Sequence, residues 1–221
     1  MQSVYEMEIV MKDKGLLLVI SGFSGTGKGT VVKRLLELHD DYALSISATT
    51  RKPRTGEVDG REYFFKSIDE FKRMIDNDEL IEYAQYVNNY YGTPKSYVEQ
   101  MLNEGKNVIL EIEIQGALNI KKMYPDAVLM FLIPPDADEL EKRLRGRNTE
   151  DEDTILARLS RASEEAEGVE NYDYIIVNDE VDKCVDTINK IVLSNKCNAS
   201  RSFELINNIR EELKKYSKGE I

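Results

Sequence analysis

Residues 22–28, with the sequence G-F-S-G-T-G-K, match the first seven positions of the phosphate-binding pattern G-x-x-x-x-G-K-[ST]. Glycines at these positions let successive main-chain N–H groups point inward around phosphate oxygens, and Lys28 adds a mobile positive charge. The last position departs from the pattern, because Gly29 follows Lys28 and the hydroxyl arrives one residue later, at Thr30. The pattern predicts that a nucleoside triphosphate binds to this segment: Gly22, Phe23, Ser24, Gly25, Thr26, Gly27, Lys28, Gly29 and Thr30.

A second pattern lies in the segment Ser47–Arg54, which reads S-A-T-T-R-K-P-R. Arg51 and Arg54 are separated by Lys52 and Pro53, and the proline restricts the turn between them. Two guanidinium groups held in this way form a cationic fork that suits a phosphate monoester. The combination predicts a site for a small phosphorylated substrate.

Two acidic residues lie within a predicted strand from Val108 to Ile114. Glu111 and Glu113 alternate along it, so both should project from one face near its carboxyl end. Ligands favour that end of a parallel sheet. These carboxylates are therefore candidates for contacts with a base or a metal ion.

The apolar segments predict the scaffold that positions these residues. Residues 15–22 form a continuous apolar run that ends in glycine, which is typical of a strand buried on both faces. The alternation of strand and helix then recurs, which predicts an α/β fold with a parallel sheet and helices on both faces. Further strands are expected at Val108–Ile114, Ala127–Ile133 and Tyr174–Val177, and helices at Val31–Leu38, Gln115–Met123, Asp136–Arg145 and Val181–Leu193.

Two stretches interrupt the alternation. The first is rich in Tyr, Phe, Arg and Gly and contains a helix that starts with the capping box Ser67–Glu70. The second is rich in arginine and then acidic. We expect a leader over 1–14, a domain over 15–196 and a C-terminal helix over 197–221; within the domain, the core comprises 15–48, 98–140 and 168–196, and the insertions 49–97 and 141–167.

Composition limits the class of protein. The net charge of −11 is unsuited to nucleic acid or an anionic membrane, and no apolar run approaches the roughly 20 residues of a membrane helix. The single histidine, His39, argues against zinc or histidine-triad chemistry. Two cysteines without metal or redox spacing are expected to be free thiols in a reducing cytosol. We expect a cytoplasmic monomer or homo-oligomer, and the start among Met1, Met7 and Met11 stays open.

Several segments together resemble the guanylate kinase family over nearly the whole chain, from about Leu16 to Leu193. The resemblance implies a P-loop three-layer α/β fold with a GMP-binding insertion and a helical lid. It also implies ATP-dependent, Mg²⁺-assisted phosphorylation of GMP and dGMP in purine nucleotide metabolism and GMP recycling. The segments are the glycine-rich loop, S-A-T-T-R-K-P-R-T-G-E, G-R-E-Y-F-F, L-I-E at 80–82, N-Y-Y-G-T, I-L-E-I-E-I-Q-G-A, L-R-G-R and I-V-N-D at 176–179.

The resemblance assigns two sets of side chains to GMP: Arg51, Arg54, Tyr63 and Tyr91 at the phosphate, and Ser47, Glu82, Thr93, Glu111 and Glu113 around the guanine. Guanine presents N1–H and a 2-amino group as adjacent donors, and one carboxylate accepts both. Adenine would leave that carboxylate unpaired, so Glu82 is expected to select guanine. Glu111, through a water molecule, and Thr30 are expected near Mg²⁺. Much of the family has aspartate in place of Glu111 and Glu113. Which of the two glutamates contacts the metal ion and which the base stays open.

The resemblance also assigns Arg143, Arg147 and Arg158 to a lid that closes over the phosphates, and Asn178 and Asp179 to the surroundings of the adenine of ATP. Phosphoryl transfer needs alignment and neutralised charge more than covalent help. We therefore expect direct in-line transfer, with the GMP phosphate as the nucleophile and Lys28, Arg51 and the lid arginines stabilising the transferring group. Arg145 and Arg161 fit ion pairs along a helix better.

Two alternatives remain. A guanylate-kinase-like module that binds phosphopeptides without catalysis usually has a degraded loop, whereas this chain keeps Lys28. A kinase for AMP or dTMP would share the loop, but the paired carboxylates argue against it. Rates with different nucleoside monophosphates separate these readings.

Overall fold

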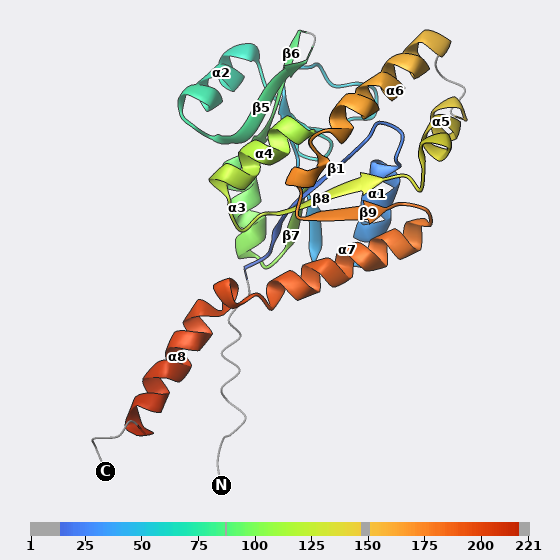
Figure 1. The fold of residues 1–221 in the computed structure, drawn as a ribbon. Helices are drawn as coiled ribbons and strands as arrows, with labels where there is room; N and C mark the ends of the chain where they lie inside the picture. Colours follow the sequence, from blue (N-terminus) through green and yellow to red (C-terminus); the bar gives the residue numbers. More distant parts are fainter. Residues whose placement is uncertain (1–13, 87, 147–150, 217–221) are drawn as a thin grey trace.

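The computed structural model describes residues 14–86, 88–146 and 151–216, so that the predictions for Met1, Met7, Met11 and Arg147 lie outside the described residues. Within these ranges, five parallel strands form the central sheet, in the order β2-β7-β1-β8-β9 (Figure 1). Leu18 of the central strand pairs with Ile109 on one side and Val128 on the other. The strands are β1 (Leu17–Gly22), β2 (Tyr42–Leu44), β7 (Asn107–Leu110), β8 (Val128–Ile133) and β9 (Tyr174–Val177).

Helices cover both faces of this sheet, as expected. On one face, α1 (Lys28–Leu38) and α7 (Val181–Lys196) pack against Leu18 and Ile20 of β1. On the other, α3 (Lys95–Asn103) and α4 (Ile114–Met123) pack against its alternate residues, Leu17 and Val19. Both faces of β1 are therefore apolar because both are buried, which explains the continuous apolar run in the sequence.

The first insertion forms a second, mixed sheet in the order β4-β3-β6-β5. Its helix α2 (Ile68–Asp76) begins with the predicted capping box, since Ser67 and Glu70 each accept a hydrogen bond from the other's main-chain N–H. Phe71 of α2 packs on this sheet and forms a small separate core with it. The strands are β3 (Ala48–Thr49), β4 (Phe64–Phe65), β5 (Leu80–Tyr86) and β6 (Asn89–Pro94).

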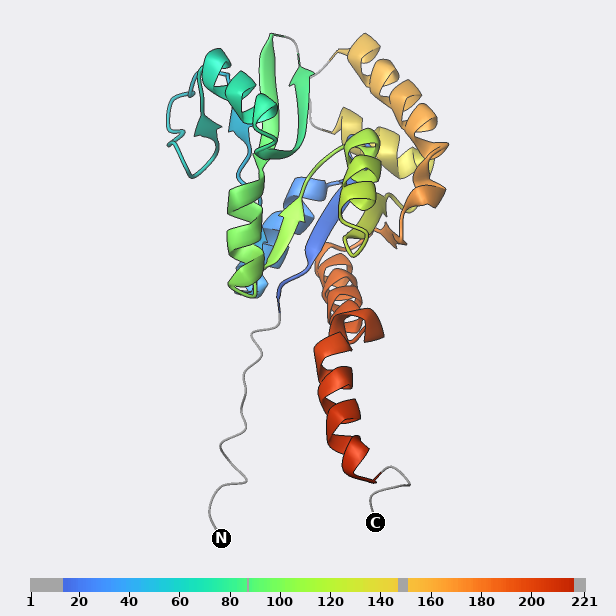
Figure 2. The ribbon, with the colours of Figure 1, turned by 90° about the vertical axis from the view of Figure 1, so that its left-hand side faces the viewer.

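The second insertion contributes two helices, α5 (Ala137–Arg145) and α6 (Glu152–Ala166). They form their own apolar cluster, to which Phe23 of the glycine-rich loop adds its ring. Figure 2 shows the first insertion and α6 on opposite sides of the carboxyl end of the central sheet. Residues that bind ligands at this end therefore lie between the two insertions.

The predicted strand Val108–Ile114 is wrong at its carboxyl end, because β7 ends at Leu110. Beyond it, the Ser21 hydroxyl donates a hydrogen bond of 2.6 Å to the Ile112 main-chain oxygen. A side-chain hydrogen bond thus satisfies the carbonyl where main-chain pairing would have continued. The residues after Leu110 form the connection to α4.

The C-terminal segment forms the expected helix, α8 (Phe203–Leu213), which extends away from the sheet (Figures 1 and 2). Its apolar residues, including Phe203 and Leu213, are exposed. Short 3-10 turns lie at η1 (Val169–Asn171), η2 (Ala199–Ser202) and η3 (Lys214–Tyr216). Among the described residues, none of the helices combines the length and the apolar character that a membrane span requires.

Candidate active site

The glycine-rich loop joins β1 to α1, as the pattern requires. Gly25 and Gly27 have φ angles of 99° and 86°, a left-handed conformation that glycine adopts at no steric cost. The Thr26 hydroxyl donates to the Phe23 main-chain oxygen at 2.9 Å and closes the loop. The ammonium group of Lys28 donates to the main-chain oxygens of Gly22 and, at 3.2 Å, Phe23, so it lies over the loop where phosphates would bind.

Two side chains from outside the loop hold its backbone. The buried Asn178 amide donates to the Thr26 main-chain oxygen at 2.6 Å. Arg143 of α5 donates to the Asn178 main-chain oxygen at 2.9 Å, while Glu139 holds the other end of its guanidinium group at 2.8 Å. Asn178 and Arg143 therefore position the loop in this structure, and Asp179 is exposed.

A cavity of about 430 Å³ lies beside the loop. Arg158 of α6 reaches over it and donates to the Ser24 hydroxyl at 3.3 Å. Glu111 lines the same cavity, where burial raises the pKa of its carboxyl group and the nearby Lys28 charge opposes the rise. The structure thus brings together Ser24, Lys28, Glu111 and Arg158, whereas Thr30 lies exposed on the first turn of α1.

Glu113 lines the same cavity as Glu111, but an arginine pairs with its carboxylate there. The prediction that both alternate along a strand is wrong, because both lie in the connection after β7, and Glu113 is the N-cap residue of α4. Its carboxylate accepts a hydrogen bond of 2.7 Å from Arg161, and its side chain is 75% exposed. Arg161 also pairs with Glu165 one turn along α6, which confirms the expectation of an ion pair along the helix. Arg145 likewise pairs with Glu141.

The predicted phosphate residues gather within the first insertion. The Arg51 guanidinium lies 5.2 Å from the centre of the Tyr63 ring, and Tyr63 packs against Tyr91 with ring centres 6.1 Å apart. Arg54 is exposed. Glu57, which the sequence analysis did not single out, pairs with Arg51 at 2.8 Å. In the sequence, Glu57 could have been found only as the last residue of the family-like segment S-A-T-T-R-K-P-R-T-G-E.

Two of the candidate guanine-binding residues, Glu82 and Thr93, lie on the antiparallel pair β5–β6. Thr93 donates to the Glu82 carboxylate at 2.7 Å. Burial raises the pKa of Glu82, and the hydrogen bond from Thr93 lowers it in part. Ser47 is half-buried beside β3, and its main-chain oxygen accepts from the Phe64 N–H at 2.9 Å.

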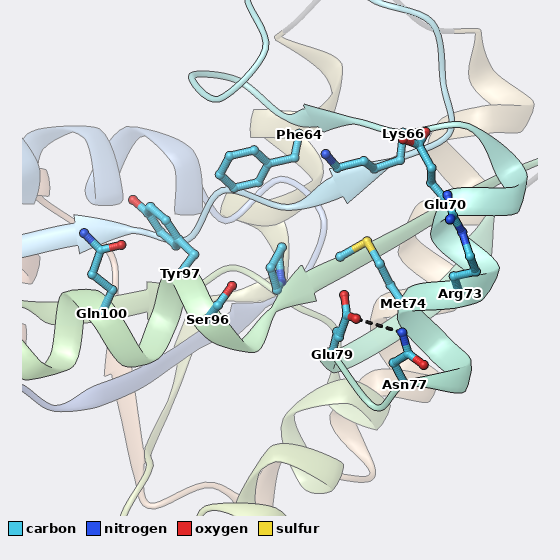
Figure 3. A pocket seen from close by; sticks show the side chains of 11 residues that line it. Phe64, Lys66, Glu70, Arg73, Met74, Asn77, Glu79, Ser96, Tyr97 and Gln100 are labelled. Atoms are coloured by element: carbon cyan, nitrogen blue, oxygen red, sulfur yellow. Dashed lines mark hydrogen bonds between the residues drawn. The ribbon is translucent and has the colours of Figure 1, made fainter.

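A larger pocket of about 510 Å³ lies elsewhere, between α2, β4 and the start of α3 (Figure 3). Phe64, Met74 and Tyr97 supply its apolar surface, and Asn77 hydrogen-bonds to Glu79 at its rim. None of the residues predicted to bind nucleotides lines it. Pocket size therefore does not identify the site in this protein. The predicted nucleotide-binding residues Ser24, Lys28 and Glu111 line the smaller cavity beside the glycine-rich loop.

Comparisons with known proteins agree with this geometry. A family model described as guanylate kinase matches residues 14–195. The chain is 50% identical over 202 residues to a guanylate kinase of Caldanaerobacter subterraneus subsp. tengcongensis, a match that covers 91% of this chain and 98% of the relative. A guanylate kinase of Lactococcus lactis subsp. lactis is 49% identical, with 88% of this chain and 95% of the relative covered.

A solved structure gives the same result for the fold. The crystal structure of guanylate kinase from Anaplasma phagocytophilum has a TM-score of 0.66 and 33% sequence identity, and the match covers 86% of this chain and 90% of that one. The central sheet, the loop and both insertions of this chain lie within the residues that the family model matches. This chain belongs to the guanylate kinase family.

Proposed function

We propose that this protein transfers the γ-phosphate of ATP to GMP and so forms ADP and GDP. The observation that carries the proposal is the half-buried Glu82 carboxylate, which accepts a hydrogen bond from Thr93 in an insertion that faces a glycine-rich phosphate loop across the carboxyl end of the sheet. The relatives named guanylate kinase support the same activity.

The acceptor is recognised by charge at one end and by donor pattern at the other. Arg51, Tyr63 and Tyr91 are clustered and suit a phosphate monoester, and Arg54 extends the positive charge. A carboxylate at position 82 accepts from the adjacent N1–H and 2-amino groups of guanine. The adenine of AMP has neither an N1–H nor a 2-amino group. AMP would therefore leave the Glu82 carboxylate unpaired, which is a strong basis for its rejection.

The donor is ATP, with its phosphates in the loop and Lys28 over the β and γ groups. Arg143, Arg147 and Arg158 belong to the lid, and Arg158 already reaches Ser24 of the loop. Closure of the lid would exclude water and protect ATP from hydrolysis. The proposal assigns Asn178 and Asp179 to the surroundings of the adenine of ATP.

The donor set at Glu111 fits a magnesium ion that arrives with ATP. Mg²⁺ in such sites needs only one or two carboxylates besides phosphate oxygens and water. Glu111 supplies a carboxylate that lines the same cavity as Lys28, and Thr30 is a second candidate. When bound, the ion would neutralise charge on the triphosphate oxygens.

Transfer then requires the two nucleotides to meet in line. The acceptor oxygen is already anionic, so a general base is unnecessary. Arg51 orients the acceptor phosphate, while Lys28 and the lid arginines stabilise the charge of the transferring group. The proposed role is in purine nucleotide metabolism and GMP recycling in the cytoplasm, with dGMP as a further substrate and the protein acting as a monomer or homo-oligomer.

A coupled assay of ADP release tests the proposal. With ATP and Mg²⁺, GMP is expected to turn over far faster than AMP or dTMP, and dGMP to follow GMP. The rate should depend on the presence of the acceptor, because ATP alone should be hydrolysed slowly. Absence of turnover with every monophosphate would favour the binding-module alternative, and faster turnover of AMP would refute the guanine assignment.

A further inference from the structure

Glu57 binds the Arg51 side chain through both of its carboxylate oxygens. The Oε1 atom accepts from Nη2 of Arg51 at 2.8 Å, and the Oε2 atom accepts from Nη1 at 2.9 Å. Both side chains are largely buried, at 16% exposure for Arg51 and 18% for Glu57. Such a two-pronged contact fixes the plane of the guanidinium group as well as its position.

The contact leaves one particular edge of the guanidinium group for another ligand. A second N–H of Nη1 donates to the main-chain oxygen of Lys52 at 2.8 Å. The five donors of arginine are thereby reduced to the Nε–H and the second Nη2–H, which are adjacent and parallel. The hydrogen bonds of Arg51 described here do not use its Nε–H, and the Tyr91 hydroxyl is a further partner close to the guanidinium group. This edge has the geometry that accepts two oxygens of one phosphate.

Aromatic rings and the neighbouring turn confine the same group. The guanidinium carbon lies 5.2 Å from the centre of the Tyr63 ring and 5.9 Å from that of Phe65. The Oε2 atom of Glu57 also accepts from the Arg54 main-chain N–H at 2.7 Å, which joins the backbone of the second arginine to the first. The hydrogen bonds from Arg51 and Arg54 lower the pKa of Glu57 and keep it ionised.

We propose that Glu57 is a positioning residue for the acceptor phosphate: it occupies the terminal edge of Arg51 and presents the lateral edge to GMP. This inference rests on the proposed function, because it assigns the phosphate of GMP to that edge. Glu57 acts through Arg51 and does not touch the nucleotide. It works against electrostatics, since its negative charge reduces the attraction of the site for a phosphate dianion.

The positioning role and the electrostatic effect predict opposite changes in the affinity for GMP, so a single substitution distinguishes them. Glu57→Gln keeps the length of the side chain, removes the charge and replaces one acceptor by an N–H₂ group that faces the Arg51 donors. If Glu57 positions Arg51, the affinity for GMP should fall by about 10-fold or more. If Glu57 only attenuated the positive charge, the affinity for GMP should rise.

Calorimetric binding of GMP and of guanosine separates positioning from a general effect on the insertion. Guanosine lacks the phosphate, so its affinity should change less than about twofold in Glu57→Gln while that of GMP falls. A parallel loss for both ligands would overturn the proposal, as would unchanged or tighter binding of GMP. Because the readout is binding, the test stands apart from the proposed activity, which fails only if the wild-type protein does not turn GMP over.

A matched control and a double variant complete the test. Glu62 lies in the same loop and likewise accepts from an arginine, Arg61, and from a main-chain N–H, that of Val58, but it is outside the phosphate cluster. Glu62→Gln should leave both affinities within about twofold; an equal loss there would assign the effect to the loop. In an Arg51→Ala background, Glu57→Gln should have no further effect on GMP, and an additive loss would contradict action through Arg51.

Discussion

Thr93 donates a hydrogen bond of 2.7 Å to the Glu82 carboxylate across the antiparallel pair β5–β6, where the two residues are direct partners. Thr93 is only 1% exposed, so its hydroxyl has little freedom to choose another acceptor. This bond uses one of the roughly four acceptor positions of the Glu82 carboxylate, so that both oxygens can still accept from a ligand. The carboxylate is thus held in place before guanine arrives, which reduces the ordering cost of binding.

Glu82→Gln should reduce kcat/KM for GMP by about 100-fold, because two charge-assisted hydrogen bonds to guanine lose their charged acceptor. The rate with AMP should change little, so the preference for GMP over AMP should narrow. The coupled assay with both nucleotides measures this. Equal losses for GMP and AMP would show that Glu82 does not read the base.

The pH dependence of GMP use should follow the raised pKa of Glu82. As the pH falls through that pKa, the carboxylate is protonated and KM for GMP should rise, at a higher pH than for an ordinary carboxyl group. Profiles of kcat/KM for the wild type and Glu82→Gln test this, since the variant should lack this acid limb. An identical acid limb in both proteins would assign it to another group.

The raised pKa of Glu82 also affects stability: a rise in pH should favour GMP binding but lower the stability of the folded state. Between the unfolded and the raised folded pKa of Glu82, the folded state binds more protons than the unfolded state, so stability falls as the pH rises. Glu82→Gln removes this cost and should be relatively more stable at neutral pH than at acidic pH. Urea unfolding at both pH values gives the comparison, and a difference independent of pH would refute it.

Lys28→Ala should lower kcat by about 1,000-fold, because the variant lacks the positive charge that Lys28 places beside the triphosphate. The fold should persist, since the hydrogen bonds of Thr26 and Asn178 hold the loop without Lys28. Lys33→Ala, an exposed lysine on the same helix, is the control and should keep normal activity. Circular dichroism verifies the fold of both variants, and near-normal turnover of Lys28→Ala would exclude the proposed role.

Two glycines of the loop region should respond differently to alanine. Gly25 has a φ angle of 99°, and a Cβ atom there would lie 2.8 Å from Leu144 of the lid. Gly25→Ala should therefore lower the free energy of unfolding by about 2 kcal/mol or more. At Gly29 no atom lies within 4 Å of an added Cβ, and Gly29→Ala should be neutral or stabilising by about 0.5–1 kcal/mol. Urea unfolding ranks the two, and equal effects would contradict the backbone argument.

Arg158→Ala should lower kcat by about 100-fold, because this arginine reaches the phosphate loop from the lid. Arg145→Ala is the matched control: Arg145 lies on the other lid helix and pairs with Glu141 and Glu152 near the surface. Its removal should leave kcat within about threefold, since exposed ion pairs contribute little. Steady-state kinetics with saturating ATP and GMP compares them, and a similar loss in both would point to the stability of the lid.

Features that depend on residues close together in the chain could be predicted from the amino-acid sequence. Local sterics, burial pattern and hydrogen bonding account for the apolar run of β1, the glycines of the loop and the capping box at Ser67. Positions of β8 and β9 were also predictable, because their apolar runs end sharply. The family resemblance added the order of the motifs, which local physics does not supply.

The ends of the strands and the pairing of distant charged residues depend on the three-dimensional packing of the chain. The short strands β2 and β3 form because they pair with β7 and β6, respectively. Strand β7 ends before Ile112, whose main-chain oxygen accepts a hydrogen bond from the Ser21 hydroxyl. Likewise, Glu113 meets Arg161 across 48 positions of sequence. Such contacts depend on the separation of side chains in space, which the spacing of residues along the chain does not determine.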